Sequence, residues 1–168
     1  MYKLKNWVPE DMLTSRLSVN PRAIDYLEKN PDKIDWIFLS SNPEAIKILE
    51  ANQDKIYWGF LCQNPEAIHL LEANQDKIDW YKLSRNPAAL DLLEANQRNI
   101  DWYKLSRNPA ALDLLEANPD RIFWTGISQN PGIFEYDYKR MKQPFTEELM
   151  QNRFHPKNLT KFEAWGYE

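Results

Sequence analysis

Side chains that commonly perform acid–base, nucleophilic or metal chemistry are few in this chain of 168 residues. It has two histidines, His69 and His155, and a single cysteine, Cys62. An internal disulfide and a cysteine-rich zinc site each need several cysteines, so neither is expected. Phosphate-binding glycine loops and the HExxH and GxSxG signatures do not occur in the sequence. We therefore expect no catalytic, cofactor-binding or metal-binding residues, and we expect that the protein is not an enzyme.

The three candidate residues each have a simpler explanation. His69 takes a position held elsewhere by unrelated polar residues, which indicates an isolated surface histidine. His155 precedes Pro156 and is expected to cap a last helix. Cys62 replaces a serine that recurs at Ser40, Ser84, Ser106 and Ser128, so a small, half-buried structural side chain is expected.

The elements that carry these residues repeat with a period of 22. The dipeptide Asn-Pro begins at Asn20, Asn42, Asn64, Asn86, Asn108 and Asn130, and a tryptophan keeps the same period at Trp36, Trp58, Trp80, Trp102 and Trp124. A fixed period of this length is typical of repeat architectures, in which each unit buries its apolar face on its neighbours.

One unit, residues 65–86, predicts two short helices. Asn64 is a favoured N-cap and Pro65 a favoured first helical residue, and apolar residues then follow at helical spacing. Asn74 is expected to end the first helix in a left-handed conformation and to cap a second helix over residues 75–84. A strand is excluded because the apolar residues do not alternate.

This pattern predicts an all-α fold: an α-solenoid, wound as a right-handed superhelix, of about five 22-residue helix-turn-helix repeats with diverged caps. We expect an N-terminal cap or half-repeat over residues 1–20, tandem repeats over 21–130, and a diverged repeat with a C-terminal cap over 131–168. Within the last segment, helices are expected over residues 146–154 and 156–165. Its many aromatic residues favour capping, with a docking surface as the alternative.

The recurring residues are interpreted as structural: Asn42, Pro43, Trp58, Asn64, Pro65, Glu72, Trp80, Asn86, Pro87 and Trp102. The tryptophans are expected to pack on adjoining repeats as a buried ladder; a ligand cage is the alternative. The glutamate that ends each first helix opposes the helix dipole, so we expect its carboxylate to accept hydrogen bonds from a following helix or from an indole. A salt bridge to a repeat lysine is the weaker option.

Function is expected at positions that vary while the frame stays constant. Three rows of such positions form the candidate partner-binding surface. The first contains Lys47, His69, Asp91 and Asp113; the second contains Asp35, Tyr57, Asp79, Asp101 and Phe123; the third contains Arg85 and Arg107. The first two rows are largely acidic, so a partner with basic and apolar features would fit them.

The consensus NPxAIxLLEANxDKIDWxxLSxNP resembles the tandem helical repeats of giant DNA viruses of the mimivirus and phycodnavirus kind. The resemblance covers roughly residues 11–135, and HPKNLTKFEAWGY is similar to a closing motif of such proteins. The resemblance implies a viral protein in the cytoplasm of an infected host cell or in the virion, and it implies no particular activity.

Two functions are compatible with these observations. The first is a protein–protein interaction scaffold that binds a host protein or a second copy of itself, and the second is a structural component of a virion or another assembly. A net charge of −4 disfavours nucleic-acid binding, which needs clustered lysine and arginine. The sequence has neither a signal peptide core nor a membrane-spanning apolar run, so secretion and membrane insertion are not expected.

Overall fold

The computed structural model describes residues 2–135, and the regular elements in that range are all helical. The chain divides into two units, residues 1–133 and 134–168, and the elements given below lie in the first unit. The helices expected over residues 146–154 and 156–165, and the role expected for His155, lie outside the described residues.

Two kinds of helix alternate along the described chain. The α-helices are α1 (Ile24–Lys29), α2 (Trp36–Ser40), α3 (Ile46–Glu50), α4 (Trp58–Leu61), α5 (Ile68–Glu72), α6 (Trp80–Leu83), α7 (Leu90–Ala95), α8 (Trp102–Leu105), α9 (Leu112–Glu116) and α10 (Trp124–Ile127). The 3₁₀ turns are η1 (Glu10–Met12), η2 (Ser15–Val19), η3 (Pro21–Ala23), η4 (Pro31–Lys33), η5 (Pro43–Ala45), η6 (Gln53–Lys55), η7 (Pro65–Ala67), η8 (Gln75–Lys77), η9 (Pro87–Ala89), η10 (Gln97–Asn99), η11 (Pro109–Ala111), η12 (Pro119–Arg121) and η13 (Pro131–Ile133). The α-solenoid of 22-residue repeats is thus confirmed.

The first helix of each repeat forms as expected, but the second does not run continuously. Ile78 and Asp79 adopt extended backbone conformations, with ψ of 126° and 91°, between η8 and α6. Asp79 instead caps α6 by accepting a hydrogen bond from the Lys82 N–H. The prediction of one helix over residues 75–84 is therefore wrong. A 3₁₀ turn is followed by a separate α-helix of four residues that has its own N-cap.

The asparagine after the first helix also differs from expectation. Asn74 has φ of −136°, which is not left-handed, and its side chain does not cap η8. Its Nδ2 donates to the Leu70 carbonyl four residues earlier, at 2.9 Å. Because this amide satisfies a carbonyl at the end of α5, it closes the first helix and does not start the next.

In five of the six Asn-Pro pairs, the asparagine joins neighbouring repeats. The Oδ1 of Asn64 caps η7 by accepting from the Glu66 N–H at 3.0 Å, as predicted. Its Nδ2 also donates to the carbonyls of Ser40 and Asn42 in the preceding repeat, at 3.3 and 2.9 Å. Equivalent pairs of bonds are made by Asn42, Asn86, Asn108 and Asn130. These five buried side chains form an asparagine ladder through the stack.

A second series of hydrogen bonds runs through the recurring serine. The Ser84 hydroxyl donates to the Trp80 carbonyl at 2.7 Å and accepts from the Asp101 N–H of the next repeat at 3.0 Å. Ser40 and Ser106 bridge their repeats in the same way. Each side chain therefore ties one short helix to the start of the following one.

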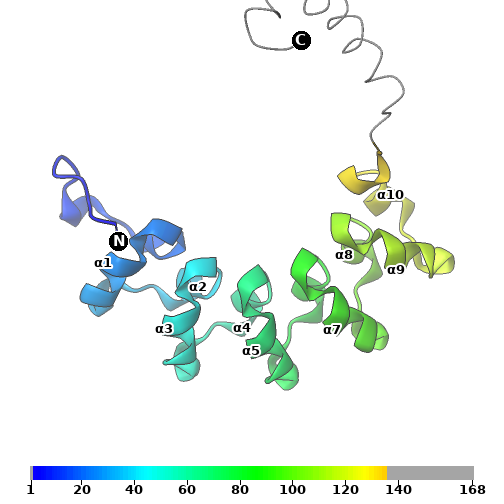
Figure 1. Ribbon diagram of the computed structural model, residues 1–168, viewed down its shortest axis with the longest axis horizontal. Helices are drawn as coiled ribbons and strands as arrows, with labels where there is room; N and C mark the ends of the chain where they lie inside the picture. Colours follow the sequence, from blue (N-terminus) through cyan, green and yellow to red (C-terminus); the bar gives the residue numbers. More distant parts are fainter. Residues whose placement is uncertain (1, 136–168) are drawn as a thin grey trace, which may run out of the picture. The chain divides into compact units, whose positions relative to one another are not determined.

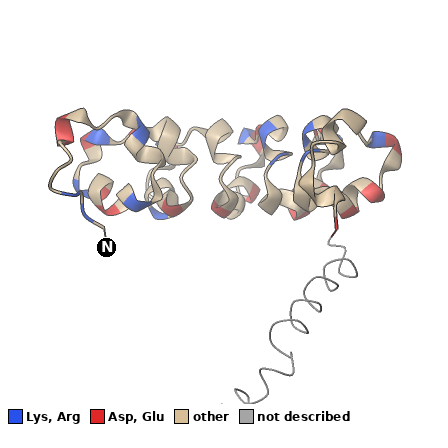
Figure 2. Ribbon diagram, turned by 90° about the horizontal axis from the view of Figure 1, so that it is seen from above, with Lys and Arg blue, Asp and Glu red and all other residues tan. Residues whose placement is uncertain are grey.

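Leucines fill the interior between the two rows of helices. One or two per repeat are almost fully buried, namely Leu27, Leu39, Leu49, Leu61, Leu71, Leu83, Leu93, Leu105 and Leu115. Odd-numbered helices follow one edge of the stack and even-numbered helices follow the other (Figure 1). Charged residues of both signs are interspersed along the described repeats, as Figure 2 shows. The core is thus continuous from repeat to repeat, and the variable residues lie on its outside.

Candidate functional site

The first row of variable residues lies on the odd-numbered helices. Lys47, His69, Asp91 and Asp113 are all exposed, at equivalent positions of α3, α5, α7 and α9. The His69 Nε2 lies 2.9 Å from a carboxylate oxygen of Glu50 in the preceding repeat. These side chains are open to a partner but differ in charge from repeat to repeat.

The second row has a local role that the sequence interpretation overlooked. Asp35, Asp79 and Asp101 are N-caps of α2, α6 and α8, and each accepts hydrogen bonds from N–H groups of its own helix. Their carboxylates are therefore already engaged in the frame of the fold. Tyr57 and Phe123 occupy the same position in α4 and α10 without capping, and both are exposed.

The third row is less uniform than expected. Arg85 is exposed, whereas Arg107 is half-buried. Neither guanidinium forms an ion pair or stacks on an aromatic ring among residues 2–135. Both remain available for contacts to a partner.

The even-numbered helices carry a surface in which aromatic rings and lysines alternate. We call it the short-helix surface and define it by Phe60, Tyr81, Lys82, Tyr103, Lys104 and Phe123. The Lys104 Nζ lies 4.4 Å from the ring centroid of Tyr81 and 5.5 Å from that of Tyr103. Tyr103 in turn meets Phe123 edge to face, with centroids 6.0 Å apart. These contacts join three successive repeats into one patch.

The rest of the short-helix surface has the same chemistry. Lys82 lies over the Phe60 ring at 5.2 Å and pairs with Asp79 at 3.5 Å. About half of the surface of Tyr81 and of Phe123 is exposed, at 53% and 49%. Aromatic residues are enriched among the residues that anchor protein partners.

The tryptophans form a separate row, and they are not a buried ladder. Trp36, Trp58, Trp80 and Trp102 are only half-buried, and Trp124 is 72% exposed. A cation from the next repeat covers three of them: Lys55 lies 4.8 Å from Trp36, Lys77 lies 4.5 Å from Trp58, and Arg121 lies 4.9 Å from Trp102. Lys55, Lys77 and Arg121 thus join these three tryptophans to the adjoining repeat, and a charged group over the ring explains why these indoles stay near the surface.

The glutamates that end the first helices do not act as expected. Glu28, Glu50, Glu72, Glu94 and Glu116 are exposed, and within the described repeats none accepts a bond from a helix start or from an indole. Lys55, Lys77 and Arg121 lie over tryptophan rings instead, and Lys33 lies over Tyr26. The basic residue that recurs at this repeat position, with Asn99 as the exception, was the signal from which the stacking could have been found.

Cys62 is more buried than the half-buried side chain that was expected, with no exposed surface. Its Sγ accepts a hydrogen bond from the Asp79 N–H at 3.3 Å, in the place of the serine hydroxyl of other repeats. Burial raises the pKa of the Cys62 thiol, so the uncharged form is favoured. This thiol is a structural group, since a reactive cysteine needs access and a lowered pKa.

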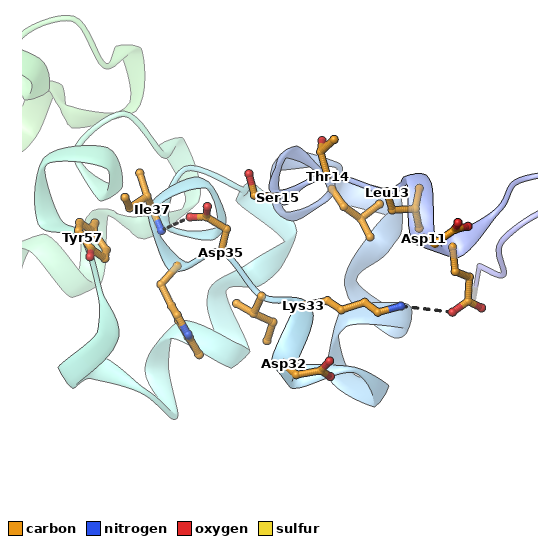
Figure 3. A pocket seen from close by; sticks show the side chains of 13 residues that line it. Asp11, Leu13, Thr14, Ser15, Asp32, Lys33, Asp35, Ile37 and Tyr57 are labelled. Carbon is orange, nitrogen blue, oxygen red and sulfur yellow. Dashed lines mark hydrogen bonds and ion pairs between the residues drawn. The ribbon is translucent and has the colours of Figure 1, made fainter.

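A cleft of about 640 Å³ lies between the N-terminal segment and the first repeat. Two of its carboxylates are already engaged: Asp35 accepts from its own Ile37 N–H, and Glu10 pairs with Lys33 of the same lining at 3.3 Å (Figure 3). Hydrogen bonds to Tyr26 and Glu10 raise the pKa of Lys33 above its usual range. Glu10 and Asp35, two of the acidic residues that line the cleft, are thus engaged by different partners.

Among residues 2–135, no three histidine, cysteine, aspartate or glutamate side chains gather closely enough to hold a metal ion. The helices described there also lack the combined length and apolar character that a membrane span requires. Comparisons with protein-family models, with curated proteins and with solved structures give no match to this chain. The short-helix surface is thus the strongest candidate site.

Proposed function

We propose that this chain is a non-enzymatic scaffold that binds another protein through its short-helix surface. The observation that supports this function is the exposure of Tyr81 and Phe123, joined through Tyr103 and Lys104 into one patch across three repeats. The frame beneath is hydrogen-bonded between repeats, so these side chains are held in place before a partner arrives. Preorganisation of this kind lowers the entropy cost of binding.

A photo-crosslinking amino acid at position 81 tests the proposal while the partner is still unidentified. Benzoylphenylalanine replaces Tyr81 in one variant and the exposed Glu66, on η7, in the control variant. Irradiation of cells that make the protein should give a discrete adduct from position 81 and none from position 66. Equal adducts from both positions, or none from either, would contradict binding at this surface.

Self-assembly is the second candidate function, because exposed aromatic residues on a repeat stack can also join copies of one chain. Light scattering during size-exclusion chromatography separates the two candidates. A mass that stays at 20.0 kDa as protein concentration rises favours a scaffold for other proteins. A mass that increases with protein concentration, and that returns to the monomer mass in the Tyr81→Ala variant, favours assembly.

The resemblance to giant-virus repeats leads us to propose a host protein as the first partner to seek.

A further inference from the structure

One position interrupts the row of cations that cover the tryptophans. Lys55, Lys77 and Arg121 each lie over the tryptophan of the preceding repeat. The residue that should cover Trp80 is Asn99, which has no charge. Trp80 is nevertheless half-buried like its equivalents, and no cation or aromatic ring of residues 2–135 stacks on it. One indole face in the middle of the row is therefore without its usual neighbour.

The structure shows what surrounds such a tryptophan in the first repeat. A groove of about 370 Å³ runs beside Trp36, and its charged lining residues are Glu28, Lys47 and Lys55. Two cations and one carboxylate thus face the groove. The cationic place above the indole is already filled by Lys55.

The equivalent positions around Trp80 carry a net negative charge. Two repeats further along, Glu28 corresponds to Glu72, Lys47 to Asp91 and Lys55 to Asn99. Glu72 and Asp91 are both exposed, and neither forms an ion pair among the described residues. The repeat correspondence therefore places two carboxylates beside an indole without its own cation, whereas the groove at Trp36 holds two lysines and one glutamate.

Arg98 is the nearest basic residue in the sequence, but it does not fill the place. It corresponds to Asp54, which is not among the residues that line the groove at Trp36. Arg98 is exposed, and its guanidinium lies over no aromatic ring of the described chain. The position from which the other repeats cover their tryptophan is residue 99, and in this repeat it is an uncharged asparagine.

We propose that Trp80, Glu72 and Asp91 form a receptor site for one arginine or lysine side chain of a protein partner. The indole supplies a cation–π surface and the two carboxylates supply complementary charge, and the partner's cation takes the place that Lys55, Lys77 and Arg121 take in their own repeats. This inference rests on the proposed scaffold function. It identifies a chemical feature of the partner, an exposed basic side chain.

A short peptide tests the site without the natural partner. The probe is acetyl-Gly-Arg-Gly-amide, titrated into the ¹⁵N-labelled protein while the indole N–H signals are followed by NMR. Its control is the same peptide with citrulline, which keeps the shape of arginine and lacks the charge. Trp80→Phe assigns the signal. We expect the shift of Trp80 to exceed the shifts of Trp58 and Trp102 about two- to fivefold, and to be lost with the citrulline peptide.

Asn99→Lys is the matched variant, since it restores the residue type of the other repeats. It should fold as the parent does, move the Trp80 signal in the absence of peptide, and abolish the response to the arginine peptide. Equal shifts at all indoles, an unchanged response in Asn99→Lys, or equal response to citrulline would overturn the site. A crosslink at position 81 without any response at Trp80 would leave the scaffold standing and remove only this inference.

Discussion

At the scale of single residues, the buried asparagine of each Asn-Pro pair combines two tasks. Its carbonyl oxygen caps the helix that follows, and its amide nitrogen binds two carbonyls of the preceding repeat. The second task needs two hydrogens on one side chain: an aspartate has none and a serine or threonine hydroxyl has one, so neither can perform both tasks in full. This explains why the five buried positions hold asparagine and not another favoured N-cap residue.

Asn86→Asp separates the two tasks. The aspartate keeps an acceptor for the Ala88 N–H but loses both donors and turns a carboxylate toward the carbonyls of Cys62 and Asn64. We expect the free energy of unfolding to fall by about 2–4 kcal/mol, measured by urea denaturation. Glu72→Ala is the surface control and should change it by less than about 0.5 kcal/mol, because Glu72 is exposed and makes no described contact. Equal costs for the two variants would refute the role of the ladder.

Cys62→Ser restores the serine of the other repeats and removes a thiol whose pKa is raised by burial. A thiol that titrates at higher pH in the folded state than in the unfolded state stabilises the fold fully below its ordinary pKa of 9.0. That contribution is lost as the pH rises from there toward the folded value. The parent should therefore lose stability relative to Cys62→Ser in urea melts above about pH 9. A constant difference from pH 7 to pH 10 would contradict this expectation.

At the scale of the elements, the frame depends on caps more than on helix length. Helices of four to six residues are far too short to be stable in isolation, so they depend on packing between repeats and, in several repeats, on side-chain caps. Asp35, Asp79 and Asp101 do this for three of the short helices. Because these carboxylates are used as caps, the exposed aromatic residues are the groups of the short-helix surface that remain available to a partner.

Substitutions can remove the aspartate N-cap from one short helix and introduce it in another. Asp79→Ala should lower the free energy of unfolding by about 1 kcal/mol, since the Lys82 N–H loses its acceptor. Tyr57→Asp introduces a cap where α4 has none and should raise stability by about 0.5–1 kcal/mol. Thermal melts followed by circular dichroism measure both changes. Stability that falls in Tyr57→Asp would show that Tyr57 packing outweighs capping.

At the scale of the whole described unit, stability is the sum of similar junctions between neighbours. Deletion of residues 87–108 joins Asn86 to Pro109 and keeps the 22-residue period. The shortened chain should remain helical and unfold with a smaller urea dependence, because it exposes less surface. Arg121 then takes the place of Asn99 above Trp80, so the response to the arginine peptide should disappear. Loss of the helical circular dichroism signal would show that the repeats are not interchangeable.

Much of the fold could be predicted from the sequence because its causes are local. Asn64 and Pro65 start a helix through their own chemistry, and apolar residues at helical spacing then identify the face that must be buried. The interruption at Ile78 and Asp79 was missed because aspartate is compatible with both a helix interior and an N-cap. Its side-chain bond to the Lys82 N–H decided between the two.

The candidate site depended on the tertiary structure, because its contacts join residues one repeat apart. The 22-residue period determines that Lys77 and Trp58 recur, but it does not determine which faces of successive repeats meet. Stacking places Lys77 over the tryptophan that lies 19 residues earlier, and not over the tryptophan three residues later in its own repeat. The same stacking places each buried asparagine against carbonyls 22 and 24 residues away. The sequence by itself thus determined the repeating helical units and the asparagine caps that start them. Packing between repeats decided which side chains contact one another and which indole has no cation over it.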